Sequence, residues 1–201
     1  FLRYALPIIL SYLLQQIYVL TDAIICGQVL TSAQVAGVND TFPLTFIFLQ
    51  FAFGCTAGFS VVTGEAVGKG DAAGVRRRSF ASQFFLSFVL SVLLTAVSIL
   101  LLPWLLGTMH LTPESGEVYR AAYDYCFVIF LGIFAQMGYN FVCGILRAYG
   151  DSVTPLFFLV FSTVLNVGLD LFFLSVLKMG PIGAAAATVI AQLISFIACT
   201  A

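Results

Sequence analysis

The sequence predicts an all-α, polytopic membrane protein that folds as a bundle of six transmembrane helices. Hydrophobic residues make up 61% of the 201 residues and charged residues only 8%, whereas a soluble domain carries about 25% charged residues. The mean hydropathy is +1.09. Six apolar stretches each have about the 20–25 residues that a helix needs to cross the hydrocarbon core. They are too long and too uniformly apolar for the alternating strands of a membrane β-barrel.

The six apolar stretches predict six helices. In chain order, these cover approximately residues 4–28, 41–66, 80–106, 119–145, 153–177 and 182–201. Pro7 and Pro43 lie in expected first turns, where a missing N–H costs little. The chain begins without Met and stops inside an apolar stretch. We therefore expect residues 1–201 to form one six-helix lobe of a longer protein whose C-terminal lobe is absent.

The positive charges predict the orientation in the membrane. Six of the eight Lys and Arg residues fall on one side of the expected bundle: Arg3, Lys69, Arg76, Arg77, Arg78 and Arg147. The positive-inside rule places this side, and with it the N-terminus, in the cytoplasm. The stretch from Gly68 to Ser79, which holds four of these cations, is expected to be a solvated loop. The first, third and fifth helices then run outward, and Trp104 is expected at the outer interface.

Several functional classes find no support in the composition. A net charge of −1 gives no reason to expect a nucleic-acid partner. The five cysteines are scattered singly in apolar stretches, in a spacing that fits neither a metal site nor a disulfide framework. His110, the single histidine, falls in an expected loop. No Ser/His/Asp set and no phosphate-binding loop is found, so the sequence predicts neither an enzyme nor an organic cofactor.

Four polar residues stand out inside the apolar stretches: Asp22, Asn166, Asp170 and Thr188. Asn166 and Asp170 are four residues apart and so share one helix face. With the predicted orientation, Asp22, Asp170 and Thr188 all lie ~10 Å below the outer end of their helices, and Asn166 lies one turn deeper. They converge if the first, fifth and sixth helices are neighbours. Ionisable residues at membrane depth usually handle an ion or a substrate, although Asp22 could be interfacial and Thr188 could bond within its own helix.

The chemistry of this set suits a proton or a sodium ion. Asp, Asn and Thr supply only oxygen ligands, which do not suit soft transition metals. Two carboxylates close together at low dielectric favour holding a proton between them. The same carboxylates would neutralise an organic cation, and competition for them would couple opposite movements of ion and substrate. Gln15, Tyr18, Tyr125, Tyr139 and Asn140 are expected to line a cavity or to bridge helices.

The sequence resembles the multidrug and toxic compound extrusion (MATE) transporters over essentially its whole length. The first expected helix carries Leu6-Pro7, Gln15-Gln16 and Thr21-Asp22, and the fifth carries the Asn-xxx-Asp of Asn166 and Asp170. Three connecting segments also resemble those of the family: Ala33–Val38, Gly64–Asp71 and Leu146–Asp151. The helix 1 Asp together with the Asn-xxx-Asp is similar to the DinF-like bacterial branch.

The resemblance implies the N-terminal half of a twelve-helix fold. It implies a cation site at Asp22, Asn166, Asp170 and Thr188, the same set that the depths select. The implied activity is efflux of organic, mainly cationic compounds or drugs in exchange for H⁺ or Na⁺. The expected location is a bacterial plasma (inner) membrane, with membrane lipid and the missing C-terminal lobe as partners.

Two other functions are kept as alternatives. A flippase of the same superfamily for a lipid-linked precursor would require cations at mid-depth to bind anionic headgroups, and the six stretches show none there. A non-transporting scaffold would have no activity that depends on Asp22 and Asp170.

Overall fold

The computed structural model describes residues 2–70 and 73–200, and the prediction of an all-α, polytopic membrane bundle is confirmed. Asp71, part of the expected loop before the third span, lies outside the described residues. The elements in chain order are α1 (Leu2–Val29), α2 (Ser32–Asp40), α3 (Phe42–Gly68), α4 (Ala73–Thr108), the 3₁₀ turn η1 (Pro113–Ser115), α5 (Glu117–Leu131), α6 (Ile133–Ala148), α7 (Val153–Asp170), the π-helical segment η2 (Leu171–Val176) and α8 (Pro181–Thr200).

Five membrane spans can be identified in the described residues by length and apolar character, and a sixth if a bent pair of helices is counted as one span. The five are α1, α3, α4, the continuous helix of α7 and η2, and α8. The remaining span is the pair α5 and α6, which meet at Gly132 with a bend of 42°. The expected helix 119–145 is therefore two helices. A Cβ at Gly132 would overlap the Val189 side chain of α8, so this glycine lets α8 approach the bend closely.

Two further differences concern the connections. Arg76, Arg77 and Arg78 lie in the first turns of α4, so the prediction that they belong to a loop is wrong. The segment between the first two spans contains the short helix α2, which begins with a capping box of Thr31 and Gln34. The Thr31 hydroxyl also donates to Glu117 of α5 over 3.1 Å, which fixes α2 against the start of α5.

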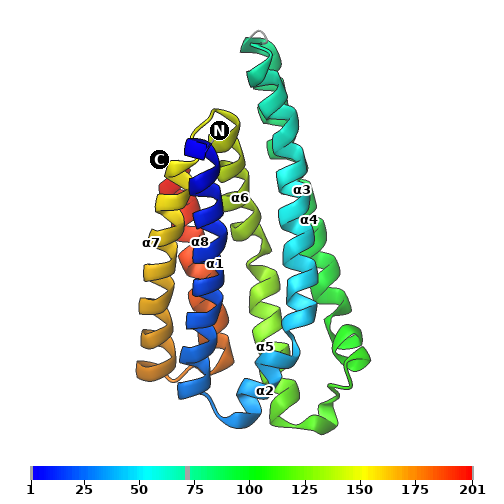
Figure 1. Cartoon of the computed structure of the whole chain (residues 1–201). Helices are drawn as coiled ribbons and strands as arrows, with labels where there is room; N and C mark the ends of the chain where they lie inside the picture. The colour runs from blue at the N-terminus through cyan, green and yellow to red at the C-terminus, as the bar shows by residue number, and fades with distance from the viewer. Residues whose placement is uncertain (1, 71–72, 201) are drawn as a thin grey trace.

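The helices form two groups joined by the bent pair α5 and α6 (Figure 1). On one side, α1 packs against α7, and α7 packs against α8. On the other side, α3 and α4 pack against each other and against α6, and they extend beyond the neighbouring helices at one end. We call this end, where Lys69 follows the last residue of α3 and Arg147 lies in the last turn of α6, the basic end.

The largest apolar core lies among α3, α4, α5 and α6. Its fully buried members include Leu102, Leu106, Phe130, Ile133 and Met137. Other large apolar side chains point outward, for example Leu100 with 79% and Val164 with 68% of its surface exposed. A soluble protein would not expose so many, whereas the outer face of a membrane bundle is expected to.

The start of α7 is fixed by a local hydrogen-bond network on Asp151. Its Oδ1 accepts from the backbone N–H groups of Val153 and Thr154, each over 3.0 Å. Its Oδ2 accepts from the Thr154 hydroxyl over 2.6 Å. These bonds satisfy donors that an isolated helix start leaves unpaired, and so the network defines where the helix that carries Asn166 and Asp170 begins.

Candidate functional site

Asn166 and Asp170 lie on the face of α7 that packs against α1 and α8. Both side chains are fully buried, with 0% of their surface exposed. Their spacing of four residues places them one above the other on this face. The four polar residues can converge only if α1, α7 and α8 are neighbours. This is the case, because α1 and α8 both contact α7 and also touch each other.

Thr188 of α8 joins the three helices through its hydroxyl oxygen. The Tyr18 hydroxyl of α1 donates to Thr188 Oγ1 over 3.1 Å. The Asn166 side-chain amide donates to the same oxygen over 3.4 Å. Thr188 is therefore an interhelical acceptor, so its role is not confined to bonds within its own helix.

Asp22 of α1 and Asp170 of α7 bring their carboxyl groups together. They are close enough to share a hydrogen bond when one of them carries a proton. Within the described part of the chain, no donor reaches either oxygen of Asp170, Oδ1 of Asp22 or Oδ1 of Asn166. Buried carboxylates without donors or counter-ions are costly. A proton or a small cation between the two carboxyl groups would remove that cost.

The oxygens of this cluster, which we call the carboxylate cluster (Asp22, Asn166, Asp170 and Thr188), set its ion preference. Carboxylate, amide and hydroxyl oxygens are hard ligands that suit Na⁺ or a proton. In residues 2–70 and 73–200, no group of three or more His, Cys, Asp or Glu side chains could hold a metal ion. The donor set thus fits an exchangeable monovalent ion better than a resident transition metal.

The structure brings two of the five other candidate residues to this cluster. Tyr18 reaches it through Thr188. Tyr125 packs with Cys26, Leu174 and Ala184 beside it.

The other three candidates lie farther away. The Tyr139 hydroxyl donates to the Pro155 carbonyl over 3.3 Å, and Pro155 precedes Asn166 by ~16 Å along α7. Asn140 is next to Tyr139, and its side-chain nitrogen is buried without a partner in the described structure. Gln15 is exposed and lies ~10 Å along α1 from Asp22.

Two neighbours of the cluster were not predicted from the sequence. Cys26, one turn beyond Asp22, is 4% exposed and packs with Leu174, which lies one turn beyond Asp170. Directly after Asp170 the helix changes to the π-helical segment η2, in which the Leu177 N–H donates to the Phe172 carbonyl over 3.0 Å. Single-turn π segments occur often at functional sites. The one sequence signal near it is the pair Gly180 and Pro181, which ends the helix but does not indicate its widening.

Comparison with known proteins identifies a matching family model and two similar bacterial proteins. The MatE family model matches residues 7–172. The probable multidrug resistance proteins YpnP and YoeA of Bacillus subtilis are 35% and 30% identical to the chain, each over 96% of its length. The chain spans only 43% and 42% of those relatives, so it corresponds to less than half of their length.

Solved structures agree with this result. The outward-facing conformation of a multidrug resistance MATE family transporter of the MOP superfamily matches 99% of the chain with a TM-score of 0.87 and 27% identity. A MATE structure in complex with MaD3S matches 99% with a TM-score of 0.89 and 26% identity. The chain covers 43% and 44% of these two structures, respectively. The family model and the B. subtilis relatives together establish that this chain, a multi-pass membrane protein, belongs to the MatE family.

Proposed function

We propose that the chain forms one lobe of a multidrug efflux transporter that exchanges organic, mainly cationic compounds for H⁺ or Na⁺. The observation that carries the proposal is the contact between Asp22 and Asp170, two carboxyl groups with an excess of acceptors and no donor within the described residues. Such a pair is stable only with a bound positive charge. The names of the B. subtilis relatives and of the matching structures support multidrug transport.

Coupling follows from competition for this charge-binding site. In the proposed cycle a proton or Na⁺ at Asp22 and Asp170 favours one conformation, and the substrate favours another. An ion can shift a conformational equilibrium only by its difference in affinity for the two states. Asp170 is fully buried and Asp22 has a buried Oδ1, so a bound cation interacts more strongly with the pair than it would in water. Asn166 and Thr188 complete the proposed ion site, and no organic cofactor is needed.

The proposed orientation places the basic end in the cytoplasm of a bacterium, in its plasma (inner) membrane. Lys69, Arg147 and the three arginines at the start of α4 lie at this end, and the excess of cations on the cytoplasmic side is the general rule. The partners in this proposal are the substrate, the surrounding lipid and a second lobe.

The test is transport by the full-length protein reconstituted in liposomes, with dye efflux driven separately by a pH gradient and by a Na⁺ gradient. We expect Asp170→Asn to reduce gradient-driven efflux to background, because the amide cannot carry the exchanged charge. Ser98→Ala, which removes a buried hydroxyl far from the carboxylate cluster, should leave efflux unchanged. Efflux that persists in Asp170→Asn would refute the coupling role of this residue, and the gradient that drives efflux identifies the ion.

A further inference from the structure

A row of polar side chains runs along α4, in the group of helices that does not hold the carboxylate cluster. We call it the α4 stripe; its members recur every three or four residues and are Gln83, Ser87, Ser91, Thr95 and Ser98. Gln83, Ser87 and Ser91 are 2%, 6% and 1% exposed, respectively. The stripe faces the neighbours of α4, since the Thr63 hydroxyl of α3 donates to Gln83 Oε1 over 2.7 Å and Thr95 donates to the Phe130 carbonyl over 3.3 Å.

Two groups of the α4 stripe are left without a partner. Ser91 and Ser98 donate to carbonyls of their own helix over 2.8 Å and 3.1 Å. In contrast, the Gln83 side-chain nitrogen and the Ser87 hydroxyl are buried and have no hydrogen-bond partner in the described part of the chain. They are four residues apart, so they lie on the same face of α4. Nearly all such buried groups in native proteins are satisfied by protein or by ordered water.

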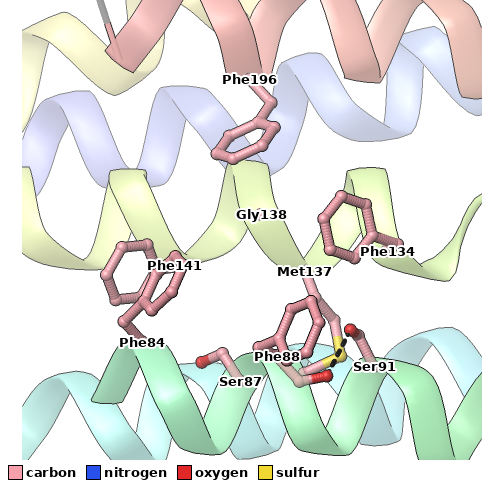
Figure 2. Close-up of a pocket in the computed structure, with 9 residues that line it drawn as sticks. All are labelled: Phe84, Ser87, Phe88, Ser91, Phe134, Met137, Gly138, Phe141 and Phe196. Carbon is pink, nitrogen blue, oxygen red and sulfur yellow. Dashed lines mark hydrogen bonds between the residues drawn. The ribbon is translucent and has the colours of Figure 1, made fainter. Parts of the chain in front are cut away.

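A small cavity lies next to Ser87 and Ser91. Figure 2 shows both serines on α4, below α6, with a surround of phenylalanines that includes Phe196 from α8. The cavity volume is about 40 Å³. A water needs at least about 10–15 Å³, whereas a cavity that holds benzene measures about 150 Å³. The size therefore selects water and excludes an organic ligand, although the aromatic lining alone would suggest one.

A larger groove lies at the basic end, close to the same residues. It lies between α3 and α6, has a volume of about 510 Å³ and includes Ser60 and Gly144 in its lining. A Cβ on Gly144 would lie 2.9 Å from Ser60 Cβ and 3.7 Å from the Gln83 side-chain nitrogen. Gln83 thus packs directly behind Gly144, which lines the groove and has no side chain to separate the two.

We propose that Gln83 and Ser87 form a buried water-binding site between α3, α4 and α6. The Gln83 amide donates to the water oxygen, and the water exchanges a hydrogen bond with the Ser87 hydroxyl. Ser91, whose oxygen still has free lone pairs, is a third partner for a water in the cavity of Figure 2. Two to four polar partners are what a buried water requires. The site is neutral and lies between α4 and α6, whereas the carboxylate cluster is formed by α1, α7 and α8. The water site therefore hydrates the group of α3, α4 and α6 and shares no residue with the carboxylate cluster.

The experiment is X-ray radiolytic labelling of the full-length protein in lipid nanodiscs, read out by mass spectrometry. Radiolysis turns water, including bound water, into hydroxyl radicals that oxidise adjacent side chains. Met137 is a native reporter, because it lines the same cavity, is only 1% exposed and is readily oxidised at its sulfur. Met179, which is 40% exposed, reports on bulk water.

We expect Met137 to be oxidised in the parent protein and the double variant Gln83→Leu/Ser87→Ala to reduce its rate about tenfold, because no water is then held beside it. The single variant Ser87→Ala should give a smaller reduction. Ser98→Ala removes a satisfied hydroxyl of the same helix and should leave the Met137 rate unchanged. The Met179 rate should be equal in all variants, which shows that the fold is intact.

An unchanged Met137 rate in both the double and the single variant would overturn the proposal. So would an equal reduction in Ser98→Ala, because the effect would then come from loosened packing of α4. The outcome is independent of transport, so the water site and the proposed efflux function can fail separately.

Discussion

The two groups of helices each bury polar side chains, but they differ in charge. In the carboxylate cluster, Asp22 and Asp170 face each other with acceptors only, and the described residues offer them no donor. In the α4 stripe, the unpaired groups are an amide and a hydroxyl, which are neutral and can donate as well as accept. Water can satisfy the second set, whereas the first needs a positive charge. Burial alone therefore does not mark a coupling site; burial combined with unneutralised charge does.

The largest effect on stability should come from removing one of the two facing charges. Asp170→Asn replaces an acceptor with a donor that can bond to Asp22, so we expect a gain of about 1–3 kcal/mol in the free energy of unfolding. Thermal unfolding of the purified protein in Na⁺-free buffer at neutral pH measures it. Ser87→Ala, the matched change in the α4 stripe, should alter the stability by less than about 1 kcal/mol.

Thermal unfolding with added Na⁺ tests whether the carboxylate cluster binds this ion. If Na⁺ is the coupling ion, it should raise the unfolding temperature of the parent protein but not that of Asp170→Asn, because ligand binding stabilises only a state with a site for it. A loss of stability in Asp170→Asn would mean that the carboxylate is held by structural contacts, and the contrast between the two regions would fail.

A pair of glycines, one in each region, should give the next largest difference. A Cβ on Gly144 of α6 would lie 2.9 Å from Ser60 Cβ, whereas a Cβ on Gly168 of α7 meets nothing within 4 Å. We expect Gly144→Ala to destabilise by about 1–3 kcal/mol through overpacking against α3. Gly168→Ala should instead stabilise by up to about 1 kcal/mol, since alanine favours a helix interior. Equal effects in a thermal unfolding assay would contradict the close packing of α3 and α6.

The smallest effect on stability is expected at Asp151, whose two carboxylate oxygens both accept hydrogen bonds. Hydrogen bonds from the Thr154 hydroxyl and from the Thr154 and Val153 N–H groups hold the pKa of Asp151 below its usual value. The stability from this depressed pKa is therefore present above about pH 4 and is lost as the pH falls below it. Asp151→Ala should cost about 1 kcal/mol at neutral pH through the lost cap.

The matched variant Asp151→Asn keeps an acceptor at the helix start and should lie between Ala and the parent. Thermal unfolding at neutral and acidic pH measures these differences in stability. The gap between the parent and Asp151→Asn should close at acidic pH, where Asp151 is protonated. A gap that does not change with pH would show that the charge of Asp151 contributes nothing to the start of α7.

Much of the fold and the members of the carboxylate cluster could be predicted because both depend on distances along the chain. Apolar length identifies a span, and the fixed rise of a helix converts the positions of Asp22, Asp170 and Thr188 into similar depths. Those three residues, with Asn166, do meet. Their role in ion coupling remains a prediction.

Features that depend on contacts between distant segments could not be predicted. The bend at Gly132 exists where Val189 of α8 needs room, and Val189 lies more than fifty residues later in the chain. The start of α4 extends through Arg76–Arg78, because charged residues are compatible with a helix that projects beyond its neighbours (Figure 1). The spacing of Gln83, Ser87, Ser91 and Thr95 was a visible signal for the α4 stripe. It becomes meaningful only when α3 and α6 are known to cover it.

Asp170 is the last residue of α7 and lies directly before the π-helical segment η2. A π turn holds one residue more than an α turn, so the chain after Asp170 carries a surplus residue stored in a helix. Releasing that residue would restore an ordinary α-helix and rotate Asp170 against everything beyond it by about 100°. The two facing carboxylates of Asp22 and Asp170 therefore meet directly before the point where the register of this span changes by one residue.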